Sequence, residues 1–300
     1  MRIDAEEVER KLTDNSWHVR YEWAQRTDFT PTSEQAERGL TDSDEHVREA
    51  WIKRLDFTPT PLQIERGLTD IHIYEKVLWI ERMDYTPTPE QVERGLTDES
   101  AWVRMIWSGR MDFTPTPEQI ERGLTDACEG VRKAWSERTD WTPTHAQIER
   151  GLQDNDEHIR STWAAREDFT PTPKQIERGL LDRSEWVRQV WAKRMDYTPT
   201  PEQIKRGLND DNEWVRRDWV ERMDWTPSSA QIEAIVYEYS TDVIIGWLGR
   251  DDIVWPNNLI QRGLQHQDST VREAWAQVSR RQNAGNVEDY ESIHVLETFI

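Results

Sequence analysis

Residues 58–85 read TPTPLQIERGLTDIHIYEKVLWIERMDY, and this 28-residue pattern recurs along almost the whole chain. A tryptophan returns at every step of 28, and most of these tryptophans follow a glycine by twelve residues. Ten coincidences at one spacing indicate a tandem array, so the chain is predicted to be a repeat protein rather than one globule. The tryptophans are Trp23, Trp51, Trp79, Trp107, Trp135, Trp163, Trp191, Trp219, Trp247 and Trp275.

Each copy opens with the signals of a short first helix. Thr60 suits the N-cap, Pro61 suits the first helical position, and Gln63 completes a capping box. Ile64 and Leu68 then lie four residues apart and give the helix one apolar stripe. The same Thr-x-x-Gln pattern begins at Thr32, Thr88, Thr116, Thr144, Thr172 and Thr200.

A second helix follows, and its pattern is clearest in the preceding copy. It is predicted to start near Asp44, a preferred N-cap residue. Val47, Ala50, Trp51 and Leu55 then fall on one side of a helix. The helix must end by the Thr-Pro sequence at 58–59, because proline and its restricted neighbour break helices.

The tryptophan and glycine columns are read as structural. A buried tryptophan hides roughly 150–250 Å² and stabilises each copy by about 4–6 kcal/mol at most, so the Trp column is the predicted core anchor. An exposed ladder that stacks on a ligand is the less favoured alternative. The glycine, Gly67 in this copy, either ends the first helix in a left-handed conformation or lets another backbone approach closely, and both alternatives stay open.

Composition agrees with an extended array of helices. Only 35% of residues are hydrophobic and 32% are charged, which fits either disorder or a fold with much surface. Seventeen tryptophans exclude disorder, because disordered chains are poor in aromatic residues. Neither helix of a copy can bury its stripe alone, so stacked copies must complete one another's core.

The column pattern resembles a known class of repeats. Val47-Arg48-x-x-Trp51, a Thr-Pro turn, then Ile64, Leu68 and Asp70 resemble the leucine-rich repeat variant and the short bacterial HEAT-like repeats. The resemblance covers about residues 9–282. It implies an all-α fold, a right-handed α-solenoid of about ten 28-residue two-helix repeats, and a protein-interaction role. The longer repeat, the tryptophan in the core column and the absence of an iron–sulfur cysteine cluster are departures from the family.

The net charge restricts the possible partners. A formal charge of −20 disfavours direct nucleic-acid binding, which needs a surplus of lysine and arginine. An acidic surface attracts cationic groups, so a basic protein partner is expected, although the charge could also serve solubility alone. Cys128 is the only cysteine, which excludes an intrachain disulfide and suits a reducing cytoplasm. The first ten residues do not read as a signal peptide, and no apolar run is long enough to cross a membrane.

No catalytic or cofactor motif stands out. Arginines such as Arg20 and Arg48 pair by spacing with aspartates such as Asp14 and Asp42, and we expect this network to join adjacent repeats. Ten equal carboxylates do not make one active site, so the chain is predicted not to be an enzyme. The seven histidines lack metal-ligand spacing, and no phosphate loop is present, so no metal or cofactor is expected.

The variable positions of the second helix are the predicted binding site. Positions equivalent to His46, Glu49 and Lys53 share one helix face, and several copies place aromatic residues or methionine there. Such residues are typical interface anchors on a fixed scaffold. The predicted partner-binding residues are His18, Tyr21, Tyr74, Val77, Trp102, Met105, Trp186, Gln189, Trp214 and Arg217.

Two segments depart from the period. The ninth copy, at about 226–253, has lost the glycine and, at Val243-Ile244, the arginine of the Val-Arg pair, and could be a bend or a partner site around Tyr237, Tyr239 and Trp255. The array is predicted to cover 1–282, and residues 283–300 to form a C-terminal capping helix or tail.

Three functions are consistent with these features. The first is a non-enzymatic scaffold whose acidic, aromatic-bearing face binds a basic protein. The second is a nucleic-acid mimic, such as a phage anti-defence or immunity-type inhibitor, that occupies a basic nucleic-acid-binding site. The third, a helical-repeat enzyme that modifies DNA, needs a basic concave face, which a charge of −20 disfavours.

Overall fold

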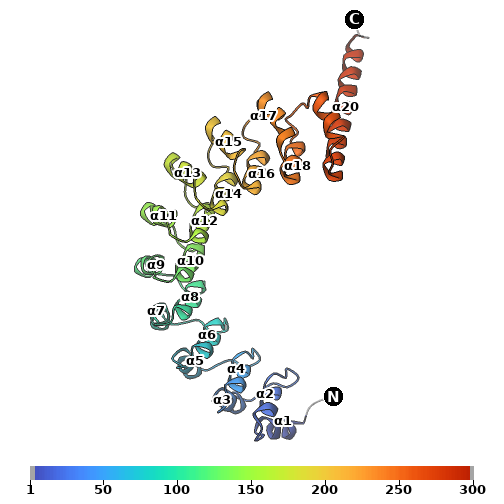
Figure 1. The fold of residues 1–300 in the computed structure, drawn as a ribbon. Helices are drawn as coiled ribbons and strands as arrows, with labels where there is room; N and C mark the ends of the chain where they lie inside the picture. The colour runs from blue at the N-terminus through green and yellow to red at the C-terminus, as the bar shows by residue number, and fades with distance from the viewer. Residues whose placement is uncertain (1–3, 298–300) are drawn as a thin grey trace. The chain divides into compact units, whose positions relative to one another are not determined.

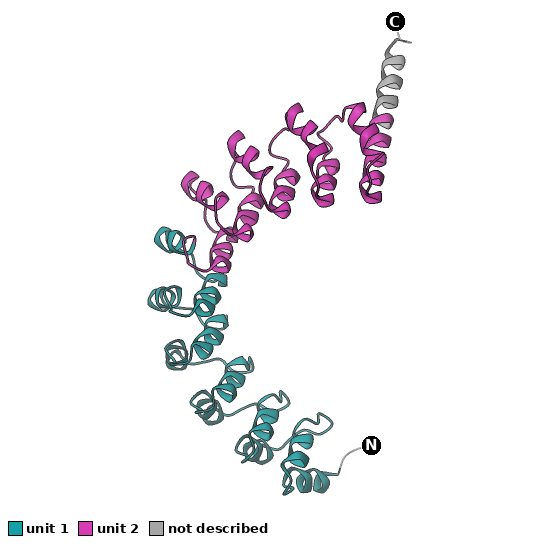
Figure 2. Cartoon of the chain, in the orientation of Figure 1, with its two compact units in different colours: residues 1–151 teal, residues 152–300 magenta. Residues whose placement is uncertain are grey.

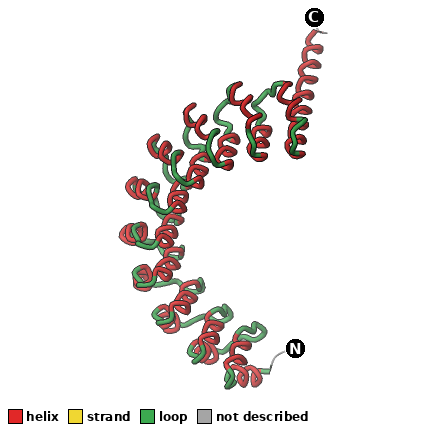
Figure 3. Tube along the Cα trace, in the orientation of Figure 1, coloured by secondary structure: helices red, strands yellow, loops and turns green. Residues whose placement is uncertain are grey.

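The computed structural model describes the backbone over residues 4–297 and side chains over 4–283, and it is helical throughout. Twenty α-helices and one 3-10 helix lie in this part of the chain, with no strand among them (Figures 1 and 3). The chain divides into two compact units, residues 1–151 and 152–300 (Figure 2). The predicted all-α solenoid of two-helix repeats is therefore confirmed, while the predicted extent of the array, 1–282, stays a prediction.

Unit 1 contains α1 (Ala5–Leu12), α2 (Trp17–Ala24), α3 (Ser33–Leu40), α4 (Glu45–Ile52), α5 (Pro61–Leu68), α6 (Ile73–Glu81), α7 (Pro89–Leu96), α8 (Ala101–Gly109), α9 (Pro117–Leu124), α10 (Glu129–Glu137) and α11 (His145–Gly151). Unit 2 contains α12 (Glu157–Ala165), α13 (Pro173–Leu180), α14 (Glu185–Lys193), α15 (Pro201–Gly207), α16 (Glu213–Glu221), α17 (Ser229–Glu233), η1 (Ala234–Tyr237), α18 (Thr241–Gly249), α19 (Asn257–Gly263) and α20 (Ser269–Glu297).

Each unit has two layers. The second helices of the repeats pack on one another in sequence, α2 to α10 in unit 1 and α12 to α20 in unit 2. We call these the second-helix layer of each unit. The first helices form the other layer and contact one another less (Figure 1). Successive copies therefore stack mainly through their second helices.

The first helices begin as the sequence predicts. Thr60 caps α5 by accepting a hydrogen bond from the Gln63 backbone, while the Gln63 side chain accepts one from the Thr60 backbone at 2.8 Å. The same reciprocal capping box begins α3, α7, α9, α13, α15 and α17. This local chemistry explains why a helix of only eight residues starts at the same column in each copy.

The second helices start at the predicted column but end earlier than the apolar stripe implied. Asp44 caps α4, as expected, and Val47, Ala50 and Trp51 are buried. Leu55, however, lies beyond the end of α4 and is 74% exposed, so its predicted place in the core is wrong. The core position after Trp51 is held by Ile52 instead.

All ten tryptophans of the column are buried, which confirms their role as core anchors. Trp135 is 1% exposed, and its ring lies against the backbone of Gly123 in the first helix of the same copy. A Cβ at Gly123 would stand 2.0 Å from the indole nitrogen. No glycine in the described chain has a positive φ. The glycine column therefore makes room for the indole ring, rather than for a left-handed turn or a second backbone.

A second arginine column, which the sequence analysis did not interpret, is buried between copies. Arg138 is 2% exposed and donates hydrogen bonds to the carbonyls of Ser108 and Arg110 in the preceding copy, at 3.0 and 2.5 Å. Its guanidinium also pairs with Asp140 at 2.6 Å and lies over the Trp135 ring at 5.2 Å. Equivalent contacts reach back from Arg54, Arg82, Arg110, Arg194, Arg222 and Arg250.

The predicted Asp–Arg network also joins adjacent copies. Arg20 pairs with Asp42 of the next copy at 2.7 Å, and it donates to the carbonyl of Asp14 rather than to that carboxylate. On the first helices, carboxylates such as Glu9 bind the glutamine and arginine of the next copy. The third copy is an exception, because Arg48 pairs with Glu75, which occupies the position equivalent to Val47. We call this position the valine column. Two ionic networks, together with the hydrogen bonds from the buried arginines to carbonyls, therefore connect the stacked copies.

The ninth copy is irregular, as its sequence indicates. Ile235 occupies the glycine column and is buried, and here the first helix ends early and continues as the 3-10 helix η1. A side chain at this column would otherwise overlap the tryptophan ring. Trp255 is buried against Trp275, whereas Tyr237 and Tyr239 are 74% and 96% exposed. Residues 283–297 of the predicted tail lie in the second half of α20, and the side chains from residue 284 onward lie outside the described residues, so the capping role stays a prediction.

Candidate binding face of the second helices

The predicted binding residues all lie on the second helices, and most of them reach the surface. Tyr74, Trp102, Trp186 and Trp214 are between 42% and 54% exposed, although the tryptophans of the core column on the same helices are buried. His18 is exposed as well, and Tyr21, Met105, Gln189 and Arg217 are half-buried. We call these positions, together with their equivalents in the other copies, the variable face.

Val77 does not belong to this surface. It is 2% exposed, so the prediction that it contacts a partner is wrong. The equivalent residues of the neighbouring copies, Glu49 and Met105, are half-buried. In the third copy the charged Glu75 takes the valine column, and Val77 is one of the apolar residues of α6 that are buried beside it.

In unit 1 the exposed aromatic residues come together across adjacent helices. The ring centroids of Tyr74 on α6 and Trp102 on α8 are 6.1 Å apart, and Nζ of Lys53, the C-cap residue of α4, lies 5.6 Å from the Tyr74 centroid. Three neighbouring helices thus contribute to one aromatic patch. A partner side chain that contacts Trp102 can contact Tyr74 at the same time.

A second aromatic cluster surrounds Trp17, which sequence reasoning did not select. Its ring stacks on His18, with centroids 3.6 Å apart, and on His46 of the next copy at 5.3 Å. Tyr21 meets the edge of His46 at 6.4 Å. The signal was present in the sequence, because Trp17 directly precedes the variable position of its helix.

In unit 2 the two exposed tryptophans lie on α14 and α16, which pack on each other. Arg217 lies over the Trp214 ring at 6.0 Å and pairs with Glu221 at 2.7 Å. Asp218, one residue further along α16, is buried beside Lys193 of α14. Unit 2 therefore places aromatic rings, cations and a buried carboxylate on the adjacent helices α14 and α16.

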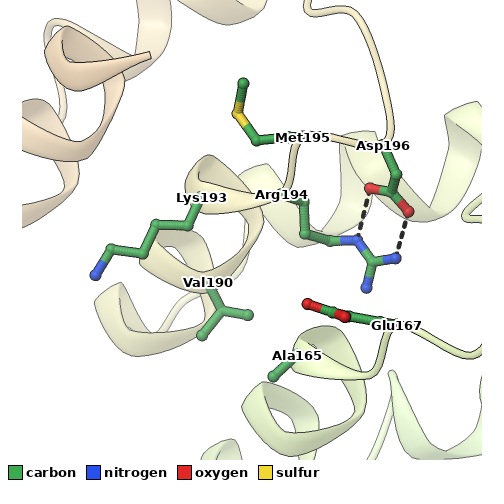
Figure 4. A pocket seen from close by; sticks show the side chains of 7 residues that line it. All are labelled: Ala165, Glu167, Val190, Lys193, Arg194, Met195 and Asp196. Atoms are coloured by element: carbon green, nitrogen blue, oxygen red, sulfur yellow. Dashed lines mark hydrogen bonds and ion pairs between the residues drawn. The ribbon is translucent and has the colours of Figure 1, made fainter.

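Exposed apolar residues, which were not predicted from the sequence to be exposed, also follow the second helices. Each of them directly follows the buried arginine of its copy, and each is at least 51% exposed. One of them, Met195, lines an open groove of about 620 Å³ between α12 and α14, with Val190 on its wall (Figure 4). Leu55 lines an equivalent groove between α2 and α4. The members of this row are Leu55, Met83, Met111, Met195 and Met223.

Three columns of carboxylates in the repeat, represented by Glu9, Asp42 and Asp140, are already paired with arginine. The hydrogen bond from Arg38 holds the pKa of Glu9 below its usual value. For Asp42, Asp126 and Asp182, burial works against ionisation, but hydrogen bonds from arginine and the backbone outweigh it and lower the pKa. These groups are therefore charged at neutral pH and locally neutralised, so they contribute little to the net charge of −20.

Part of the surplus negative charge lies at the N-termini of the second helices. Glutamates fill the first position of many second helices, where a negative charge interacts favourably with the helix dipole. Because each directly precedes a variable position, Glu185 stands next to Trp186 and Glu213 next to Trp214. The acidic residues of this row are Glu45, Glu129, Glu157, Glu185 and Glu213.

Other kinds of site are not apparent in the described residues. Over this part of the chain, no group of three or more His, Cys, Asp or Glu side chains is arranged to hold a metal ion. No described helix combines the length and the apolar character needed to span a bilayer.

Comparison with known proteins supports the fold. A solved structure described as a leucine-rich repeat variant with a novel repetitive protein structural motif is similar to this chain, with a TM-score of 0.55. The similarity covers 80% of this chain and 88% of the other, at 18% sequence identity. No family model matches the sequence, and no curated protein matches it. The resemblance inferred from the repeat columns is thus confirmed at the level of fold.

Proposed function

We propose that this protein is a non-enzymatic scaffold that binds a basic protein through the variable face. The observation that carries the proposal is the exposure of large aromatic rings, Trp102 in unit 1 and Trp186 and Trp214 in unit 2, on helices whose other tryptophan is buried. If a partner covers these rings, the removal of their apolar surface from water stabilises the complex. Repeat folds of this kind expose extended surfaces suited to such binding.

The expected charge of the partner comes from the row of glutamates beside these rings. A partner with lysine or arginine can place its cations near Glu185 and Glu213 while its apolar atoms cover the neighbouring tryptophans. Cations are also attracted to the faces of the rings themselves. The exposed Met195 and Met223 lie on the same helix layer and extend the apolar part of the surface. A cytoplasmic location is part of this proposal and rests on Cys128 being the only cysteine.

A nucleic-acid mimic is the alternative function. It requires carboxylates that stay free to replace phosphates along a regular path. In the described repeats, three columns of carboxylates pair with arginine instead, as Asp42, Asp140 and Glu9 do. This pairing favours the scaffold over the mimic. Competition with duplex DNA for the captured partner separates them, because a mimic and DNA would exclude each other.

The test begins with affinity capture from the source cell by the parent protein, followed by binding kinetics with the purified partner. Trp102→Ala and Trp214→Ala are expected to raise the dissociation rate without changing the helical circular dichroism. Added salt is expected mainly to slow association. Trp107→Ala, in the buried column of the same helix as Trp102, is the matched control and should damage the fold itself. If both surface variants dissociate as slowly as the parent, the variable face is not the binding site.

A further inference from the structure

One buried carboxylate on the second-helix layer of unit 2 has no role in the ionic networks that join the copies. Asp218 of α16 is 7% exposed, and its Oδ2 has no hydrogen-bond partner in the described structure. Lys193 Nζ lies 3.4 Å from this atom, but the Lys193 side chain is 59% exposed. The same column holds Glu22, Thr162 and Gly246 in three other copies, and apolar residues in the rest, namely Ala50, Leu78, Ile106, Ala134, Val190 and Ala274. The fold therefore does not require a charge at this column.

The surroundings of Asp218 differ from those of a structural ion pair. Arg188 binds Asp210 through two nitrogens at 2.7 and 2.8 Å, and both side chains are largely buried. Lys193 instead makes one long contact and stays mostly in water. Burial raises the pKa of Asp218, and Lys193 and Gln189 only partly oppose this shift. The carboxylate is thus desolvated and incompletely compensated, which costs stability in the free protein.

The exposed tryptophans lie on the same two packed helices as this carboxylate and its lysine. Trp214 precedes Asp218 by four residues, so the two share one face of α16. Trp186 and Lys193 are seven residues apart on one face of α14, which packs against α16. The charged neighbours are the ion pair of Arg217 and Glu221, in which Arg217 already lies over the Trp214 ring. The contact of Arg217 shows that the Trp214 ring accepts a guanidinium group.

We propose that Asp218, Trp186 and Trp214 form a receptor for one arginine side chain of the partner, which replaces Lys193 at the carboxylate. The inference rests on the proposed function and specifies the group that the site receives. Arginine fits because its planar guanidinium binds a carboxylate through two hydrogen bonds, stacks on indole rings and loses less hydration than an ammonium group. The exposed Lys193 side chain can move into solvent without breaking the fold.

The experiment uses the full chain labelled with 5-fluorotryptophan and a defined probe. The probe is the capped peptide Gly-Gly-Arg-Gly-Gly, and its control carries the neutral isostere citrulline in place of arginine. Fluorine NMR follows Trp186 and Trp214, whose signals are assigned from Trp186→Phe and Trp214→Phe. We expect the arginine peptide to shift both signals saturably and the citrulline peptide to shift neither. Asp218→Asn should weaken binding of the arginine peptide at least about tenfold.

A second measurement separates a binding role from a structural one. Asp218→Ala restores the side chain found at this column in other copies, so its unfolding midpoint should rise above that of the parent. A lower midpoint would mean that the carboxylate stabilises the fold, and it would overturn the inference. Equal shifts by the two peptides, or unchanged affinity in Asp218→Asn, would do the same. If the Asp218 variants bind the captured partner normally while Trp214→Ala does not, the receptor is wrong and the scaffold function stands.

Discussion

The contact between glycine and tryptophan within each copy leads to a prediction with an unexpected sign. Replacing a helical glycine by alanine usually stabilises a helix, by about 1 kcal/mol. At Gly123 of α9, however, the new Cβ would stand 2.0 Å from the Trp135 indole nitrogen, whereas ordinary contact begins near 3.4 Å. Trp135 is 1% exposed and cannot move aside without disturbing the neighbouring copies.

The magnitude follows from these two opposing effects. Forcing an extra carbon into a packed core costs about 1–3 kcal/mol, and an overlap this large with a rigid ring belongs at the upper end of that range. After subtracting the gain in helix propensity, we expect Gly123→Ala to lower the free energy of unfolding by about 2 kcal/mol. Urea titration followed by circular dichroism measures this change. The slope of the transition must be compared as well, because repeat arrays can depart from two-state unfolding.

Gly109 is the matched control. It ends α8 of the same unit, and a Cβ there would meet nothing within 4 Å. Gly109→Ala should therefore leave stability unchanged or raise it by up to about 1 kcal/mol. If Gly123→Ala is as stable as Gly109→Ala, the glycine column does not make room for the ring, and our reading of the core is refuted.

Two further predictions follow from the core and from the ionic networks. Trp135→Ala should cost about 3–5 kcal/mol in urea titration, whereas Trp186→Ala, at an exposed ring, should cost less than about 0.5 kcal/mol; similar costs would contradict the assigned burial. Because the folded pKa values of Asp42 and Asp126 lie below the unfolded value of about 3.9, their pairs stabilise the fold above that pH and cease to do so as pH falls through the folded pKa. The urea concentration at the unfolding midpoint should therefore fall when the pH is lowered below about 4, and this fall should be smaller in Asp42→Asn. A midpoint that does not change between about pH 6 and pH 3 would be inconsistent with a stabilising role of these pairs.

The regular part of the fold was predictable because its signals are local and repeated. Thr60 and Gln63 encode the start of a helix within four residues, and ten tryptophans at one spacing encode a shared core. The position of the indole ring could not be read in the same way. Whether Gly67 serves a turn or a close approach depends on how Trp79 packs twelve residues later, which is a tertiary contact.

Predictions that depend on the neighbouring copy were less successful. Leu55 follows the apolar period of α4, yet the helix ends before it, so the side chain is exposed. Val77 occupies a surface column, but the altered third copy buries it. The burial of Arg138 depends on carbonyl groups 28 and 30 residues earlier, which no local pattern reveals. The four exposed aromatic side chains were identified correctly as exposed, because their column varies while the core columns do not.

The buried arginines donate hydrogen bonds to carbonyls of the preceding copy, and this has a consequence for the number of copies in the array. Arg138 needs only two backbone carbonyls, and every regular copy offers an equivalent pair at the same place. The carbonyls of Ile80 and Arg82 now accept hydrogen bonds from Arg110. If residues 85–112 were deleted, these carbonyls would accept hydrogen bonds from Arg138 instead. Lys76 would likewise meet Asp126 in place of Asp98, its present partner. Recombination between equal copies can thus shorten or lengthen the gene by whole repeats and leave each joint with a complete set of contacts.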